Sequence, residues 1–346
     1  MIARVRIIVL SAVFVGLLGT YVVGSLSISR ARRPAGAQAP VIETELLSET
    51  EEIRISRRGG QELQTLLRRG EHDDDRWQVR IEGGFYPADS GRVEGFLEVL
   101  GELRRLRVAG DDQQYHEEFD VSEDSARVVE LRDDTGSPIE RLLVGKVAAG
   151  GGRLYLRTGD ADEVLVVQDD VGAYLRREIP YWSDLKPLPG DLEPQAIIRM
   201  SIDGDLRVDS ETRIADRFTV FRDVVDGERA WAMDTATGNV GERLDTERVD
   251  AYAARLSRVE ASAFVVDPPE QAGFDRPAVS IELETDSGRE YTVEVGDRAG
   301  ESRFYMRVTG TGVETTDNGE PYLYTVEAEQ LKPLLRNRDE LMPEEE

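Results

Sequence analysis

Acidic side chains are the groups in this sequence that could most readily do chemistry, and several occur in short runs. The 346 residues include 69 Asp plus Glu against 43 Lys plus Arg. Three of the runs lie at residues 73–75, 160–163 and 317–320. A calcium loop of the EF-hand kind needs acids at alternating positions, a glycine at the sixth and a glutamate at the twelfth, and none of these runs has that spacing. We therefore interpret them as solvated loops and predict no metal ligand.

The two histidines, His72 and His116, are the candidates for acid–base catalysis. A Ser-His-Asp triad would need one of them beside an activated serine, and the chain after its apolar N-terminal segment has no Gly-x-Ser-x-Gly elbow. Both histidines lie among charged neighbours, which is typical of exposed positions. The sequence therefore predicts no catalytic residue and a protein that is not an enzyme.

The three glycines at residues 150–152 follow Lys146 and raise the question of a phosphate-binding loop. A Walker-type loop ends in Gly-Lys-Ser/Thr, whose lysine and hydroxyl hold phosphate and magnesium, and that ending is missing here. A flexible hairpin is the better interpretation. The chain also has no cysteine, which excludes disulfides and thiolate zinc sites. We predict no cofactor and no cofactor-binding residue.

The charge balance excludes two classes of partner. The net charge of −26 argues against nucleic acid, because phosphate binding needs clustered cations. It also argues against docking of the acidic body on anionic lipid headgroups. Only three of the 43 cations are lysines, at positions 146, 186 and 332, and an acidic, lysine-poor surface is the composition that a salt-adapted protein would need.

Residues 7–29 contain no charged side chain, and arginines flank them on both sides. About 20 apolar residues in a helix span a bilayer, so the segment predicts a transmembrane helix. A cleaved signal peptide is the alternative, with a small-x-small pattern at residues 37–39, but secretory apolar regions usually run only about 7–15 residues. The short N-terminal stub and the cysteine-free body favour a single-pass protein of the cytoplasmic membrane with its body in the periplasm.

The sequence after residue 50 shows the same order of features twice. In each half an aspartate, Asp89 or Asp245, stands at a helix N-cap position before an apolar stripe with spacings of three and four residues. Turn signals at residues 134–136 and 286–288 predict hairpins. Other matched segments are 119–120 with 274–275, 143–146 with 294–297, and 154–157 with 304–307, and closing helices are expected near 169–177 and 328–336.

Aromatic side chains also recur in both halves at expected strand positions. They are Trp77 and Tyr155 in the first half, and Trp231 and Tyr305 in the second. Such placement is usually core packing. A ligand-binding role is the alternative, since binding pockets are lined with such residues.

These patterns together predict an α+β fold class. We expect an N-terminal transmembrane helix followed by two similar α+β repeats with mainly antiparallel sheets, because turns of hairpin length join the late strands. The expected parts are a cytoplasmic stub and anchor (1–29), a linker (30–49), a first repeat (50–190), a second repeat (191–340) and an acidic tail (341–346).

Several motifs together resemble one bacterial family of domains of unknown function. They are the strand with Trp77, Tyr86-Pro87-Ala88-Asp89, Val144-Gly145, Tyr155-x-Arg157 and Trp182-Ser183-Asp184-Leu185-Lys186. Members of that family are single-span anchored, internally repeated proteins found with gliding-motility-type ABC transporters. The second half departs at Arg243-Leu244-Asp245, and the family offers no catalytic residues to transfer. The resemblance implies as partners an ABC-2-type permease and its auxiliary extracytoplasmic subunits, beside the lipid bilayer through residues 7–29.

Three functions remain open at this point. The first is a membrane-anchored, extracytoplasmic and non-enzymatic auxiliary subunit of an ABC-2-type transport system. The second is a free-standing extracytoplasmic binding module for a polymer, a peptide or a cation. The third is a hydrolase with a site assembled from both halves, which would need convergent polar groups in a pocket.

Overall fold

The computed structural model describes residues 39–70, 76–159, 161–209, 213–225, 228–234 and 240–343. The predicted anchor at residues 7–29 lies outside the described residues, as do residues 30–38 of the predicted linker, His72 and the acidic run 73–75. No helix in the described part of the chain is both long enough and apolar enough to cross a membrane.

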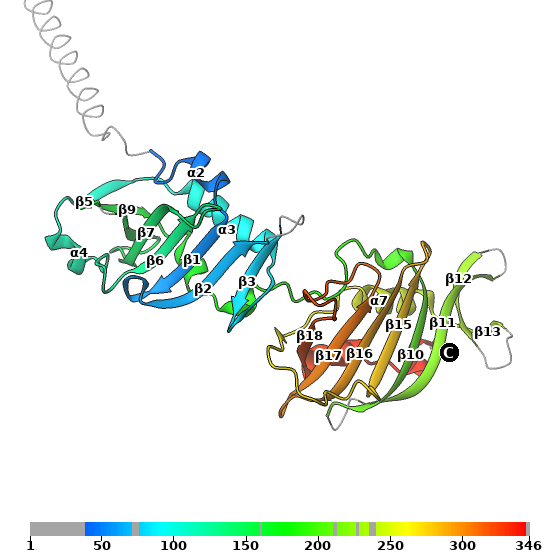
Figure 1. The fold of residues 1–346 in the computed structure, drawn as a ribbon. Helices are drawn as coiled ribbons and strands as arrows, with labels where there is room; N and C mark the ends of the chain where they lie inside the picture. Colours follow the sequence, from blue (N-terminus) through cyan, green and yellow to red (C-terminus); the bar gives the residue numbers. More distant parts are fainter. Residues whose placement is uncertain are drawn as a thin grey trace, which may run out of the picture. The chain divides into compact units, whose positions relative to one another are not determined.

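The first of two nine-stranded antiparallel sheets has the strand order β4-β3-β2-β1-β6-β7-β8-β9-β5 (Figure 1). Its middle strands are joined by hairpins, and Gly136 supplies the left-handed turn (φ +78°) between β6 and β7 that the sequence predicts. The strands are β1 (Glu52–Arg57), β2 (Glu62–Arg69), β3 (Trp77–Ile81), β4 (Gly84–Pro87), β5 (Arg107–Gly110), β6 (Arg127–Arg132), β7 (Pro138–Val147), β8 (Arg153–Thr158) and β9 (Val164–Gln168).

The second sheet has the order β13-β12-β11-β10-β15-β16-β17-β18-β14, so each strand takes the same place as its counterpart in the first sheet. Gly288 (φ +76°) makes the predicted hairpin turn between β15 and β16. The strands are β10 (Ile197–Arg207), β11 (Arg213–Val225), β12 (Glu228–Asp234), β13 (Val240–Arg243), β14 (Ala263–Phe264), β15 (Val279–Thr285), β16 (Glu290–Arg298), β17 (Arg303–Gly310) and β18 (Leu323–Glu327).

The two longest helices among the described residues are α3 (Ser90–Glu102) and α7 (Thr246–Leu256). Both predicted apolar stripes are buried except for the half-buried Leu97, and the Asp245 carboxylate caps α7 by accepting the N–H of Arg248 at 3.1 Å. The remaining helical pieces are short: α2 (Thr44–Ser48), α4 (Gln114–Glu118), α5 (Gly172–Leu175), α6 (Ile179–Trp182), α8 (Ala328–Leu331), and the 3₁₀ turns η1 (Arg58–Gly60), η2 (Pro194–Ala196), η3 (Lys332–Leu334) and η4 (Arg338–Leu341).

The predicted α+β class is wrong for the residues that the structure describes, and the predicted leading transmembrane helix lies outside them. The described residues form a mostly antiparallel-sheet protein, in which helices are short additions to two large sheets. The expected closing helices shrink to single α-helical turns, α5 and α8. Pro333 explains the end of α8, because it follows α8 by two residues and cannot donate the N–H that would continue an α-helix, whereas Pro180 lies inside α6 and does not limit α5.

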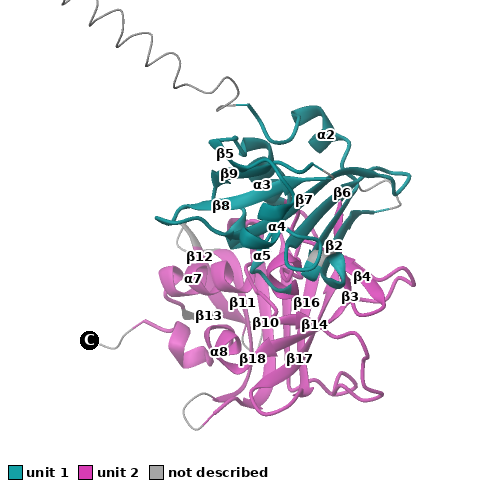
Figure 2. Cartoon of the chain, turned by 90° about the vertical axis from the view of Figure 1, so that its left-hand side faces the viewer, with its two compact units in different colours: residues 1–75, 91–178 teal, residues 76–90, 179–346 magenta. Residues whose placement is uncertain are grey.

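By its contacts the chain divides into two compact units (Figure 2). Unit 1 comprises residues 1–75 and 91–178, and unit 2 comprises residues 76–90 and 179–346. The two repeats expected from the sequence, residues 50–190 and 191–340, remain a prediction. In unit 2, Trp231 is buried and its indole N–H donates to the Asp250 carboxylate at 2.8 Å, while Trp77 is equally buried. For these two tryptophans the core-packing interpretation is confirmed.

Candidate functional site

A cavity of about 840 Å³ lies within unit 2. Its walls come from Tyr86 on β4, from the loop between Val265 and Arg276, from Asp297 and Arg307, and from residues between Thr316 and Leu323. The volume falls in the range of about 300–1,000 Å³ that is usual for small-molecule sites. The cavity is therefore the candidate binding site of this unit.

The loop that forms one wall begins after β14 and cannot continue as a paired strand. Pro268 and Pro269 fix the backbone φ and lack N–H donors, so the chain leaves the sheet there. The loop returns to β16 where the Ala272 carbonyl accepts the N–H of Asp297 at 2.9 Å. Gly296 makes this approach possible, because a β-carbon there would collide with the Ala272 oxygen.

Arg307 and Phe274 both line the cavity. The Arg307 guanidinium carbon lies 4.5 Å from the centroid of the Phe274 ring, which is a cation–π arrangement. Glu294 is the register partner of Arg307 on β16, and its Oε2 accepts from Nε at 2.8 Å and lies 2.6 Å from Nη2. These contacts fix the guanidinium in one orientation.

Two further aromatic rings form an aromatic wall of the cavity. Tyr86 and Tyr322 line the cavity with ring centroids 5.8 Å apart, and the buried Phe264 lies behind both at 4.9 and 5.3 Å. Such tilted pairs stabilise one another by about 0.5–1.5 kcal/mol beyond their burial. The wall is therefore pre-formed and presents two phenol rings to the cavity.

The electrostatic environment of the cavity is negative. Four exposed acids line it, Glu270, Asp275, Asp297 and Glu320, and none of them makes an ion pair with another described residue. Burial raises the pKa of Tyr322 to about 12, and the carboxylates of Glu314 and Asp317 add to the rise. Burial also raises the pKa of Tyr86, with Asp267 and Glu82 contributing.

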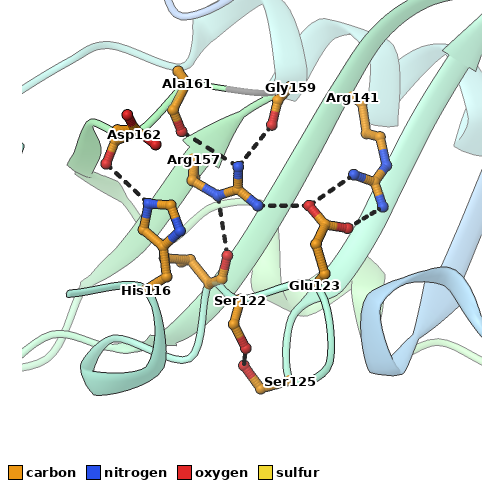
Figure 3. Close-up of polar contacts among 10 residues, drawn as sticks. His116, Ser122, Glu123, Ser125, Arg141, Arg157, Gly159, Ala161 and Asp162 are labelled. Carbon is orange, nitrogen blue, oxygen red and sulfur yellow. Dashed lines mark hydrogen bonds and ion pairs between the residues drawn. The ribbon is translucent and has the colours of Figure 1, made fainter. Parts of the chain in front are cut away.

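Unit 1 contains a polar network around the buried Arg157 of β8 (Figure 3). The Arg157 side chain is only 5% exposed. Its guanidinium donates to the carbonyls of Val121 at 3.1 Å, Gly159 at 2.9 Å and Ala161 at 3.3 Å, and to the Glu123 carboxylate at 2.6 Å. Arg157 therefore holds two loops against the sheet.

Glu123 accepts from two arginines. Arg141 binds both carboxylate oxygens at 3.0 and 2.7 Å, and Arg157 shares one of them. The hydrogen bond from Arg141 lowers the pKa of Glu123, burial opposes this, and Arg157 lowers it further, with a net decrease. The Glu123 carboxylate and the guanidinium groups of Arg141 and Arg157 already bind one another, so we interpret the network as structural.

Arg157 and Arg307 lie at corresponding places, because β8 and β17 hold the same position in their sheets. In register, Arg157 faces Leu143 and Arg307 faces Glu294, which agrees with the sequence match of 143–146 with 294–297. The predicted correspondence of Phe119 with Phe274 is wrong, because the structural counterpart of Phe119 lies two residues before Phe274. Gly145 lies under the Phe119 carbonyl as Gly296 lies under that of Ala272, so Phe119 corresponds to Ala272.

The structure separates the residues that the sequence singled out. His116 lies half-buried on α4, where Nε2 donates to the Asp162 carbonyl at 2.9 Å (Figure 3). The glycines at 150–152 form the predicted hairpin turn, all with positive φ. Glu320 from the run 317–320 lines the cavity, whereas Glu163 pairs with Arg105 at 2.5 Å. Among the described residues no group of three or more His, Cys, Asp or Glu could hold a metal ion.

The cavity itself was not predicted from the sequence. One signal was present, the pair Pro268-Pro269 directly after a strand and before Phe274, because two prolines break pairing and leave a segment standing off the sheet. Tyr86, Tyr322 and Arg307 are too far apart in the sequence for any local pattern to join them.

Comparison with known proteins gives one family and one relative. The family model for "Domain of unknown function (DUF4340)" matches residues 77–277, more than half of the chain. An uncharacterized protein of Treponema pallidum (strain Nichols) is 22% identical over 151 residues, which cover 44% of this chain and 46% of that protein. The chain thus matches about half the length of this relative. No solved structure matches the chain.

Proposed function

Since the chain belongs to the DUF4340 family, we propose that it is a non-enzymatic, extracytoplasmic auxiliary subunit of an ABC-2-type transport system. In this proposal the subunit works by binding, and the cavity of unit 2 receives part of its partner. The partners are the permease of that system and its other extracytoplasmic subunits.

The observation that carries the proposal is the pre-formed cavity in unit 2. Most of its lining lies inside the residues that the family model matches, including Tyr86, Phe274 and the proline loop. Aromatic rings and prolines supply rigid apolar surface, and the carboxylates with Arg307 supply orientation. These groups recognise a ligand, and the proposal needs no reaction from them.

A free-standing binding module is the second candidate, and the same cavity favours it. The two functions differ only in what is bound. An auxiliary subunit binds a transporter component, whereas a free-standing module binds its ligand without one.

Affinity purification of the full chain from cross-linked membranes of its native cell tests the proposal. We expect an ABC permease or its ATPase among the recovered proteins. A variant with Tyr322→Ala, which removes one ring of the wall, is expected to recover at least about tenfold less, since truncation of an aromatic hot-spot residue costs about 2 kcal/mol or more. Glu282→Gln is the matched control, because Glu282 is exposed on β15 and does not line the cavity. Repeated recovery without any transporter component contradicts the proposal and favours the free-standing module.

A further inference from the structure

We propose that the cavity of unit 2 receives an arginine or lysine side chain from an extended segment of a partner protein. The inference rests on the proposed function, because it names the chemistry of the partner that the cavity binds. Charge, aromatic surface and hydrogen-bonding capacity each support it.

The charges that line the cavity favour a cation. Glu270, Asp275, Asp297 and Glu320 come from three different segments and lie exposed around it. Two arginines also line it, but Glu294 binds Arg307 through two nitrogens and neutralises it, which leaves Arg276. A cationic side chain is the complement of such a surface.

The aromatic wall favours the same occupant. The faces of Tyr86 and Tyr322 carry the negative part of the ring quadrupole, and a cation over such a face is stabilised by about 0.5–2 kcal/mol. Phe264 holds both rings from behind, so little side-chain entropy is lost when a ligand binds. An arginine or lysine has the apolar stem that packs on these rings and the charged end that reaches the acids.

The size of the cavity and Arg307 favour a peptide over a small ion. One water occupies about 30 Å³ of liquid, so 840 Å³ accommodates several side chains of a segment. Nη1 of Arg307 makes no hydrogen bond to any residue that the structure describes. It can donate to the carbonyl of a bound backbone while Glu294 holds the rest of the guanidinium.

Unit 1 shows this use of an arginine within the chain itself. Arg157 occupies the place that corresponds to Arg307, and it donates to three backbone carbonyls of the loops that cover it. In unit 2 a partner segment takes the role that the loops of unit 1 take for Arg157. The partner thus contributes backbone carbonyls to Arg307 and a basic side chain to the aromatic wall.

Fluorescence anisotropy with the full-length protein tests the inference. The probe is a labelled synthetic peptide in which arginine alternates with glycine, and the comparison peptide carries the neutral isostere citrulline at every arginine. We expect the citrulline peptide to bind at least about tenfold more weakly, the size of a desolvated cation–π contact together with its ion pair.

The matched protein variants separate the cavity from the general negative charge. Glu270→Gln with Glu320→Gln neutralises two acids of the cavity and is expected to weaken the arginine peptide at least about tenfold. Glu260→Gln with Glu282→Gln changes the net charge equally at exposed positions outside the cavity and is expected to leave the affinity unchanged. All four side chains are exposed, so both variants retain the fold.

Equal binding of the two peptides, or equal loss in the two double variants, overturns the inference. A failure of the proposed function can be distinguished from a failure of this inference. If the arginine peptide binds as expected but no transporter component is recovered from membranes, the partner is a basic protein of another kind. If the Glu270→Gln, Glu320→Gln variant still recovers the transporter as wild type does, the auxiliary function stands and the cationic occupant is wrong.

Discussion

Arg157 and Arg307 occupy corresponding places on β8 and β17 but have different surroundings. The strand neighbour decides the difference. Glu294 lies directly beside Arg307 in register and binds it, whereas Arg157 has Leu143 in that place and reaches instead to Glu123 and three carbonyls. The adjacent strand therefore gives the two arginines different neighbours, Glu294 for Arg307 and Leu143 for Arg157.

Replacing Arg157 with Met is expected to lower the free energy of unfolding of unit 1 by about 2–4 kcal/mol, because buried carbonyls lose their donor and an ion pair loses one partner. Chemical denaturation followed by circular dichroism measures the change. Arg141→Met is the control, since Arg141 binds the same carboxylate from a more exposed position and is expected to cost about 1 kcal/mol or less. Equal losses in both variants would contradict the structural role of Arg157.

The raised pKa of Tyr322 predicts that the stability of the fold depends on pH in the alkaline range. Its pKa rises on folding from 10.0 to about 12, so the folded state keeps the proton longer than the unfolded chain does. The stability that this provides is fully present below pH 10 and is lost as the pH rises toward 12. We expect Tyr322→Phe to flatten the fall in melting temperature over that interval, with Tyr305→Phe, outside the cavity, as the control. An unchanged slope would show that another group titrates there.

At the scale of elements, each unit has a loop that crosses over a strand, and the segment that makes this crossing determines the surface beside it. In unit 1 the chain that crosses β7 at Gly145 continues from α4, and Phe119 stacks on Tyr155 with centroids 4.2 Å apart. In unit 2 the chain that crosses β16 at Gly296 comes from the proline loop, and the cavity lies beside it. A helix and a proline loop at the same place in the topology thus give different surfaces.

Gly296→Ala is expected to lower the free energy of unfolding by roughly 1–3 kcal/mol, because the new methyl group overlaps the Ala272 carbonyl and displaces the loop. It should also weaken binding of the arginine peptide, since Phe274 and Asp275 move with the loop. Thermal unfolding and anisotropy measure the two effects. Gly190→Ala is the control, because nothing lies within 4 Å of its added carbon. A stable variant with unchanged binding would show that the crossing is not needed.

Local patterns predicted the elements better than their arrangement. The spacing of Val249, Tyr252 and Leu256 is enough to define one face of α7, and Asp245 is enough to cap it. The α+β class failed because short segments such as 169–177 do not reveal whether a helix will extend beyond one turn. The length of a helix depends on nearby prolines, as at α8, and on the apolar surface of the sheet against which the helix packs.

At the scale of the whole molecule, the net charge of −26 is the dominant property. Forty of the 43 cations are arginines, and the ion pairs of the described residues are mostly between arginine and a carboxylate. Exposed pairs of this kind contribute little each, so self-repulsion of the excess acids remains. Salt screens that repulsion over a Debye length of about 10 Å at 0.1 M.

We therefore expect the melting temperature to rise by at least about 2–4 °C between low salt and about 1 M KCl, which corresponds to roughly 1 kcal/mol for domains of this size. Differential scanning calorimetry measures the shift. Sorbitol at matched osmolality, which does not screen charge, is the control. A melting temperature that stays constant or falls as the KCl concentration rises would contradict the salt-adaptation hypothesis.

The sequence by itself determined the properties that depend on neighbours along the chain. They include the net charge, the two long helices with their buried faces, and the hairpin turns at Gly136 and Gly288. These features arise from contacts within a few residues, which a pattern can represent. The tertiary structure alone decided the sheet order, the neighbour of each arginine and the cavity. Those depend on pairing between distant segments, such as β10 with β15 or Tyr86 with Tyr322, and no local spacing records which segments meet.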